Sequence, residues 1–188
     1  MRRALGFILL ALIGLGLVGF LVVRTEPAWF LRMRYPLQYQ SIVDAHADNY
    51  GLEPSLLAAV IYTESKFDPN AKSSAGAIGL MQLLPATAQG IADHTGGGHY
   101  RPADLYNPEI NIRYGAYYLA RLAHKYRDHP DALDLALAAY NAGQGNVDRW
   151  VAAAGAGAPV RIPFRETRDY LERVHRLQGV YQRAYGLR

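Results

Sequence analysis

One glutamate lies on an otherwise apolar helix face within residues 56–88. The spacing i, i+3, i+4 and i+7 puts four residues on one side of an α-helix: Leu57, Val60, Ile61 and Glu64. Burial against the apolar residues disfavours the ionised carboxylate, and the last helical turn brings the negative end of the backbone dipole beside it. Both effects predict a raised pKa for Glu64, so that its carboxyl group holds a proton near neutral pH and can donate it. Taken alone, the pattern favours a glutamate that turns out to solvent; the motifs that follow favour the chemical role.

Three later motifs also carry unusual polar side chains. GLMQ (residues 79–82) ends a loop whose glycines permit the backbone to approach another group closely. AYNAG (residues 139–143) ends a nearly apolar helix with a phenol and an amide. IPFRETR (residues 162–168) opens the last long helix with a charged cluster, in which the helix dipole favours the anion of Glu166. These motifs are candidates for a single site around Glu64.

Four blocks of this sequence, in this order, resemble the catalytic domain of the soluble-type lytic transglycosylases, family 1, which are relatives of goose-type lysozyme. The resemblance covers residues 47–181. Two positions differ from the family's common pattern, Gln144 in place of proline and Asp169 in place of asparagine, and neither touches the chemistry that the family implies. The four blocks are ESKFDPNAKSSAGAIGLMQLLPATA, LYNPEINIRYGAYYL, ALAAYNAG and IPFRETRDYLERV.

The resemblance implies cleavage of peptidoglycan glycan strands at the β-1,4 bond between N-acetylmuramic acid and N-acetylglucosamine. Glu64 matches the family's catalytic glutamate. It would protonate the glycosidic oxygen as a general acid and then, as a carboxylate, remove the proton from the muramoyl C6 hydroxyl. Attack of that hydroxyl on C1 would give a 1,6-anhydro sugar without water. No cofactor is expected, and the six histidines show no metal-ligand spacing such as HExxH.

The resemblance also implies substrate-binding positions beside the acid. An amide would hydrogen-bond sugar or acetamido groups, a thioether would form an apolar wall of the cleft, and a phenol would point at the reacting centre or at Glu64. A second amide would fix the loop or a sugar, and a second acid would be an accessory polar group. With the serine that follows the acid, the set is Ser65, Met81, Gln82, Tyr140, Asn141 and Glu166.

Structural alternatives remain open for three of these positions. Met81 is of a type that more often lies in the core, and the alternative role for Asn141 is that of a helix cap and nothing more. Glu166 can cap its own helix and pair with Arg168.

Two other functions also remain open. A hydrolytic muramidase would use a second carboxylate, for which Asp68 and Glu166 are the candidates. A non-catalytic cell-wall-binding scaffold would keep the fold without turnover.

The elements that must position these residues are predicted to be helices. Apolar residues recur at helical spacing, and no alternating strand pattern persists, so any strand content is expected to be short and local. The fold class is therefore mainly α, and the resemblance implies a lysozyme-like helical domain. Helices are expected at residues 41–50, from residue 54 to the stop at Asp68-Pro69, and at residues 85–92, 107–126, 131–141, 146–153 and 166–185.

The first forty residues predict a membrane anchor. Residues 4–23 contain no charged or strongly polar side chain, and as a helix they span roughly 30 Å, the thickness of a bilayer core. We expect an uncleaved signal anchor (residues 1–24), a juxtamembrane linker (residues 25–40) and a catalytic domain (residues 41–188). A cleaved leader is the less favoured alternative, because no small-x-small cleavage site follows the run.

Charge and composition indicate the surroundings. The net charge of +4 suits an anionic neighbour, whereas the dispersed basic residues and the lack of a nucleic-acid motif argue against nucleic acid. Arg2 and Arg3 favour a cytoplasmic N-terminus, while Trp29, Phe30 and Tyr35 suit the interface on the other side. The expected location is the bacterial inner membrane, with the catalytic domain facing the periplasm. The absence of cysteine is compatible with that oxidising compartment.

Overall fold

Helices carry most of the chain. A computed structural model describes residues 2–95, 99–155 and 157–187, and the side chains from residue 12 onward. Within these residues no strand is formed, and the only sheet-like pairs are the isolated bridges Lys72–Ile78 and Ile78–Leu83. The mainly α fold class is confirmed. The helices are α1 (Arg2–Thr25), α2 (Ala28–Arg34), α3 (Gln40–Tyr50), α4 (Pro54–Ser65), α5 (Pro85–Thr95), η1 (Pro102–Tyr106), α6 (Pro108–Tyr126), α7 (Ala132–Ala142), α8 (Gln144–Ala154) and α9 (Arg165–Tyr185).

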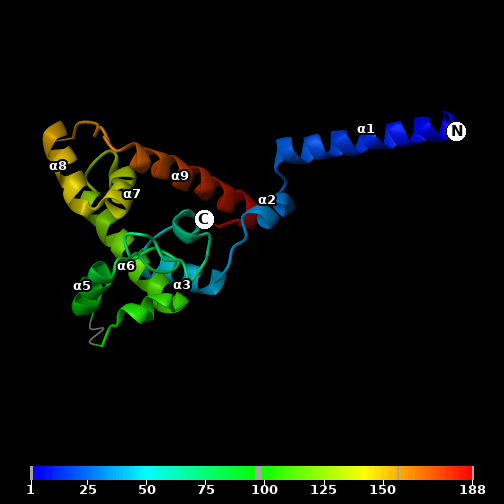
Figure 1. The fold of residues 1–188 in the computed structure, drawn as a ribbon. Helices are drawn as coiled ribbons and strands as arrows, with labels where there is room; N and C mark the ends of the chain where they lie inside the picture. Colours follow the sequence, from blue (N-terminus) through cyan, green and yellow to red (C-terminus); the bar gives the residue numbers. More distant parts are fainter. Residues whose placement is uncertain (1, 96–98, 156, 188) are drawn as a thin grey trace.

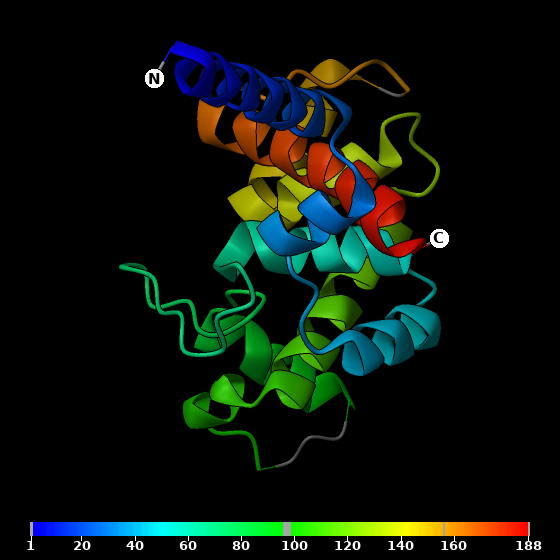
Figure 2. The ribbon, with the colours of Figure 1, turned by 90° about the vertical axis from the view of Figure 1, so that its right-hand side faces the viewer.

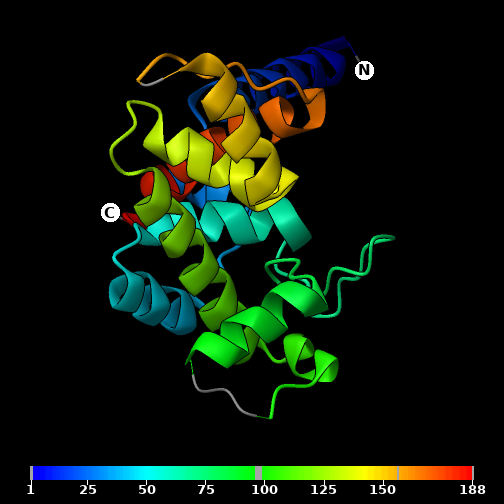
Figure 3. The same ribbon diagram turned by 90° about the vertical axis from the view of Figure 1, so that its left-hand side faces the viewer.

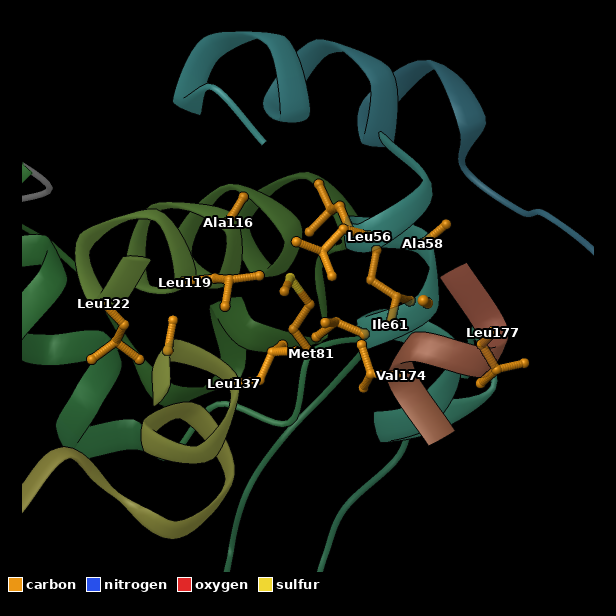
Figure 4. Close-up of a cluster of buried hydrophobic side chains, with 14 of the residues drawn as sticks. Leu56, Ala58, Ile61, Met81, Ala116, Leu119, Leu122, Leu137, Val174 and Leu177 are labelled. Carbon is orange, nitrogen blue, oxygen red and sulfur yellow. The ribbon is translucent and has the colours of Figure 1, made fainter. Parts of the chain in front are cut away.

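The centre of the domain is α4, which carries Glu64. Every residue from Ser55 to Ile61 is buried, so the helix is apolar on all sides over two turns and not on one face alone. It begins at Pro54, as predicted, and ends where Lys66 adopts a left-handed conformation (φ 55°) and donates its backbone N–H to the Tyr62 carbonyl. The longest helix contact of α4 is with α9, and Figure 4 shows Ile61 of α4 beside Val174 of α9.

Two further helices, α6 and α7, contribute to this main core. The side chain of Asn107 caps α6 by accepting hydrogen bonds from two backbone N–H groups of the first turn, as the Asn-Pro-Glu sequence predicts. The nearly apolar α7 is buried over residues 135–139 and packs on both α6 and α9. Figure 3 shows α7 and α8 stacked above α5 and the long loop that precedes it.

A second, smaller apolar cluster lies at the N-terminal half of α6. It is built from α5, η1, the loop before α5 and the start of α6, and its buried members are Ile78, Leu83, Ala88, Ile91, Ala92, Leu105 and Tyr114. Tyr118 and Tyr140 are partly buried, and Tyr140 packs against both this cluster and the main core. The boundary between the two clusters therefore carries aromatic side chains that are not fully covered.

The N-terminal segment differs in part from the prediction. α1 projects away from the other helices in Figure 1 and points toward the viewer in Figure 2, and its described large apolar residues other than Val22 are exposed. The expected linker (residues 25–40) contains α2, which packs on α9. Among the residues with described side chains, no single helix is long and apolar enough to cross a bilayer. Leu12–Thr25 and Ala28–Arg34, which meet at 80°, reach that length and composition only as a bent pair.

Candidate active site

Glu64 is the acid at the carbonyl end of α4, and its side chain lines a pocket of about 370 Å³. Burial raises the pKa of Glu64 from an ordinary 4.5 to about 7, which agrees with the direction predicted from the sequence. The chain just after it is bent, because Lys66 and Phe67 both have positive φ angles (55° and 65°). Such angles are costly for residues other than glycine, and they tend to persist where a site must be held in place.

Two residues of α9 act on the same carboxyl group. The Tyr170 hydroxyl and the positive charge of Arg173 both lower the pKa of Glu64, against the larger effect of burial. Tyr170 is buried, and its hydroxyl makes no hydrogen bond of standard geometry with any described residue. We therefore treat the approach of this hydroxyl to Glu64 as a polar contact and not as a formed hydrogen bond. The Tyr170 hydroxyl is therefore close to Glu64 whether that carboxyl group is protonated or ionised.

The pocket lies between the main core and the smaller cluster. The loop before α5, α5 itself and the end of α7 supply most of its lining. Glu64 of α4 and Tyr118 of α6 supply the rest. The lining residues are Glu64, Ser73, Ala75, Ala77, Gln82, Leu83, Leu84, Thr87, Tyr118, Tyr140, Asn141, Ala142 and Gly143.

Gln82 reaches the pocket from a strained loop position, with a φ of 47°. Its side-chain nitrogen donates to the carbonyl oxygens of Gly79 (2.9 Å) and Ala71 (3.2 Å). Because both partners are acceptors, the amide must face them with its nitrogen, which leaves its oxygen as an acceptor for another group. The predicted role of Gln82 toward a sugar thus becomes that of an acceptor, for example from an acetamido N–H.

Asn111, a residue that the sequence reading did not single out, fixes this loop. It is completely buried, accepts a hydrogen bond from the backbone N–H of Met81 (2.8 Å), and donates to the carbonyls of Ile78 (2.9 Å) and Leu105 (2.8 Å). The close approach explains Gly79, because a Cβ there would collide with the Asn111 side chain and the Leu105 carbonyl. The signal was available in the sequence: an amide on the same stripe of α6 as its core residues.

Ser65 and Tyr140 also hold the loop, although both were predicted to face the substrate. Ser65 Oγ donates to the Leu80 carbonyl (2.8 Å) and lies 3.2 Å from the Ile61 carbonyl. The Tyr140 hydroxyl lines the pocket but donates to the Met81 carbonyl (2.8 Å). Having donated its only proton, this phenol can act toward the pocket only as an acceptor.

Asn141 lies at the end of α7 and lines the pocket, as expected. Its side-chain oxygen accepts a hydrogen bond from the buried Thr167 hydroxyl of α9 (2.9 Å). In this orientation the side-chain nitrogen of Asn141 remains a donor for another group.

Besides Ser65, three residues considered from the sequence lie outside the pocket lining. Met81 is completely buried, fits against Gly115, and appears in Figure 4 among the core side chains, so its predicted role as a cleft wall is not supported. Glu166 is exposed in the first turn of α9 and forms neither a cap hydrogen bond nor an ion pair with a described residue. Asp68 is exposed and accepts a hydrogen bond from the Asn70 backbone N–H (2.8 Å).

The resulting arrangement can perform proton transfer at one carboxyl group. Glu64 is the only acid among the lining residues, and its pKa near 7 lets it hold or release a proton at neutral pH. Gln82 and Asn141 offer an acceptor and a donor beside it. In the described part of the chain, no group of three or more His, Asp or Glu residues is arranged to hold a metal ion.

The sequence of this chain matches the transglycosylase SLT domain family over residues 41–160. It is 35% identical over 162 residues to a soluble lytic murein transglycosylase of Salmonella typhimurium, covering 83% of this chain and 25% of that relative. It is 37% identical over 166 residues to membrane-bound lytic murein transglycosylase C of Actinobacillus pleuropneumoniae, covering 77% and 46%. The chain thus spans between a quarter and about half of the length of these relatives.

The fold is similar to that of a solved lytic transglycosylase, Slt, from Pseudomonas aeruginosa. The TM-score is 0.72 at 33% sequence identity, and the match covers 82% of this chain and 25% of that chain. The solved protein is an inactive mutant in which a glutamate is replaced by glutamine. The lysozyme-like fold class that the sequence predicted is confirmed by this likeness.

Proposed function

Since the chain belongs to the transglycosylase SLT domain family, we propose that it is a lytic murein transglycosylase, an enzyme that cleaves the glycan strands of peptidoglycan. The bond cleaved is the β-1,4 bond from N-acetylmuramic acid to N-acetylglucosamine, and the product carries a 1,6-anhydro end. The observation that carries this proposal is a single carboxyl group, Glu64, in the lining of a pocket and with a pKa of about 7.

Glu64 acts first as the acid. Protonated near neutral pH, it donates its proton to the glycosidic oxygen as the bond to C1 lengthens and positive charge develops on the muramoyl ring. The resulting carboxylate lies in a partly buried site, where its negative charge stabilises the positive charge on the ring. The glutamate-to-glutamine change in the similar inactive protein from Pseudomonas aeruginosa supports an essential carboxyl group in the family.

Glu64 acts next as the base. The carboxylate takes the proton of the muramoyl C6 hydroxyl, whose oxygen attacks C1 and closes the anhydro ring, and the glutamate returns to its protonated state. A pKa near ambient pH suits both halves of this cycle. Gln82 accepts from, and Asn141 donates to, the sugar substituents that hold the ring in place.

The absence of a second acid in the lining favours the internal nucleophile over water. Hydrolysis by the two-carboxylate route needs a second carboxylate that activates water or bonds to C1. The two residues considered for that role, Asp68 and Glu166, are exposed outside the lining of the pocket.

The test is the mass of the products released from purified sacculi. We expect muropeptides that are lighter by one water per cleavage than hydrolysis products, and reducing ends as the sole product would refute the transglycosylase assignment. E64Q is expected to bind sacculi without releasing soluble muropeptides. The matched control E166Q changes an exposed glutamate in the same way and is expected to keep the activity.

The proposed location is the inner membrane, with the catalytic domain in the periplasm. The apolar run of residues 4–23, within α1, would span the bilayer. The likeness to a relative named as membrane-bound supports this proposal. Protease added to spheroplasts is expected to degrade the catalytic domain and to leave a protected N-terminal fragment; recovery of a soluble, shortened chain would instead support a cleaved leader.

A further inference from the structure

Directly after α1, the short helix α2 exposes two large apolar side chains. Trp29 is 60% exposed and Met33 is 68% exposed, and their i, i+4 spacing puts them on the same side of the helix. The sequence predicted that Trp29, Phe30 and Tyr35 would all lie at the membrane interface, and the structure exposes them unequally. Phe30 and Tyr35 are partly buried, so Trp29 is the only aromatic side chain of the three that is largely open.

The opposite side of α2 is fixed to the catalytic domain. Leu31 is completely buried against Val180 and Ala184 of α9. The Arg32 side chain donates to the Ala184 carbonyl (2.6 Å), and Glu26 pairs with Arg183 (3.3 Å). These contacts hold α2 in a fixed orientation relative to α9.

The residues after α2 extend this attachment. The Tyr185 hydroxyl donates to the Tyr35 carbonyl (3.0 Å) and accepts from the Leu37 backbone N–H (2.9 Å). The segment that joins α1 to the catalytic domain is thus held by hydrogen bonds to the last turn of α9.

This attachment excludes α2 from the interior of a membrane. If α2 formed the second half of a bent span, α9 would have to enter the hydrocarbon with it, together with the exposed charges of Arg176 and Arg183. The angle of 80° between the two segments gives a different solution. With α1 near the membrane normal, tilted by about 20° as such helices are on average, α2 lies close to the plane of the bilayer.

We propose that α2 rests in the interfacial layer of the lipid bilayer, with Trp29 and Met33 inserted among the headgroups. This proposal depends on the anchor role proposed above for α1. Trp29 follows the apolar run by only six residues, which brings it to headgroup depth, and tryptophan is a preferred residue there. The exposed cations of Arg24 and Arg34 lie on either side of the two apolar side chains and suit anionic lipid headgroups.

If α2 lies at the membrane surface, the active site is held at a fixed distance from that surface. Ala184 of α9 contacts α2 and Tyr170 of α9 contacts Glu64, so these two contact points lie 14 residues apart along α9 (184 − 170). That is roughly 20 Å at 1.5 Å per residue. Figure 1 shows α1 and α2 at one end of α9 and α8 at the other. The enzyme would then act on glycan strands within a limited layer next to the membrane.

The chain contains no cysteine, so a single introduced cysteine reports on one place. M33C is labelled with a nitroxide in the full chain in vesicles of phosphatidylethanolamine and phosphatidylglycerol, and collisions with oxygen and with a water-soluble nickel complex are compared. The matched control is A86C, an exposed position on α5 at the far end of the molecule from α1 (Figure 1). We expect the oxygen-to-nickel collision ratio of M33C to exceed that of A86C severalfold.

Two readings would overturn the inference. A ratio equal to that of A86C means that Met33 faces water, and low collision rates with both reagents mean that protein covers it. Flotation of the same vesicles separates this inference from the anchor. A chain that does not float refutes the anchor and this inference together, whereas a floating chain with an aqueous label at M33C refutes this inference alone.

Discussion

Replacing Glu64 by glutamine is expected to stabilise the fold, by an amount that depends on pH. The reason is the cost of ionising a buried carboxyl group, which raises the pKa of Glu64 from 4.5 to about 7 in the folded chain. This difference of 2.5 pH units corresponds to about 3 kcal/mol, at about 1.4 kcal/mol per unit. Glutamine has nearly the same shape, never ionises and does not carry that cost.

The sign follows from proton binding. Below pH 4.5 the carboxyl group is protonated in the folded and in the unfolded chain, so Glu64 and glutamine differ little. Between pH 4.5 and pH 7 the folded chain keeps a proton that the unfolded chain has lost, and the parent loses stability as the pH rises. Above pH 7 both states are ionised and the full penalty of about 3 kcal/mol remains. The advantage of E64Q should therefore grow from near zero at low pH to that value.

The assay is the free energy of unfolding of the full chain in detergent, from urea titrations followed by near-ultraviolet circular dichroism at several pH values. Only the difference between E64Q and the parent is interpreted, because every other titrating group cancels in it. The matched control E166Q makes the same change at an exposed glutamate, and its effect on stability should be small beside that of E64Q at high pH. A difference for E64Q that stays constant across pH, or a loss of stability at high pH, would refute the burial argument.

Three further predictions follow from contacts around the site. N111A leaves the Met81 N–H and the Leu105 carbonyl without partners, while the Ile78 carbonyl keeps the Leu83 N–H, so it should cost about 2 kcal/mol or more of unfolding free energy, measured by urea titration; a cost below about 1 kcal/mol would contradict the role of Asn111 in fixing the loop. G115A puts a Cβ against the Met81 side chain and should cost about 1–3 kcal/mol, while M81A combined with it should cost less than the two single changes added, since the clash is gone. R173Q removes a positive charge that lowers the pKa of Glu64, so the alkaline limb of the pH–activity profile on sacculi should move to higher pH; an unchanged or acid-shifted limb would contradict it.

The helical pattern, together with the later motifs, was sufficient to predict the acid and the direction of its pKa shift. Helical spacing placed Glu64 on the same side of α4 as buried apolar residues, and burial is the main cause of its raised pKa. The proline at the start of α4 and the asparagine cap of α6 were predictable from their residue types. Prediction worked wherever a regular helix related sequence spacing to direction in space.

Prediction failed where that relation is absent. Residues 79–82 form a loop with positive φ at Gly79 and Gln82, so no periodicity indicates which side chain faces the pocket. Met81 consequently turned out to lie in the core, while its neighbour Gln82 reaches the pocket. The direction of the Tyr140 hydroxyl was unpredictable for the same reason, because its acceptor is a backbone carbonyl of that loop.

The residues that tune the acid show a second limit, which is tertiary docking. Helical spacing places Tyr170 on the inward face of α9, but only the packing of α9 on α4 brings its hydroxyl and the charge of Arg173 to Glu64, about a hundred residues away in sequence. Burial raises the pKa of Glu64 and the two groups of α9 lower it, so the value near 7 depends on how closely α4 and α9 dock. A displacement of α9 away from α4 would remove the lowering contacts and also admit water, with opposite effects on the pKa. Because α2 is fixed to the far end of α9, the segment that we propose to contact the membrane and the proton affinity of the acid are connected through one helix.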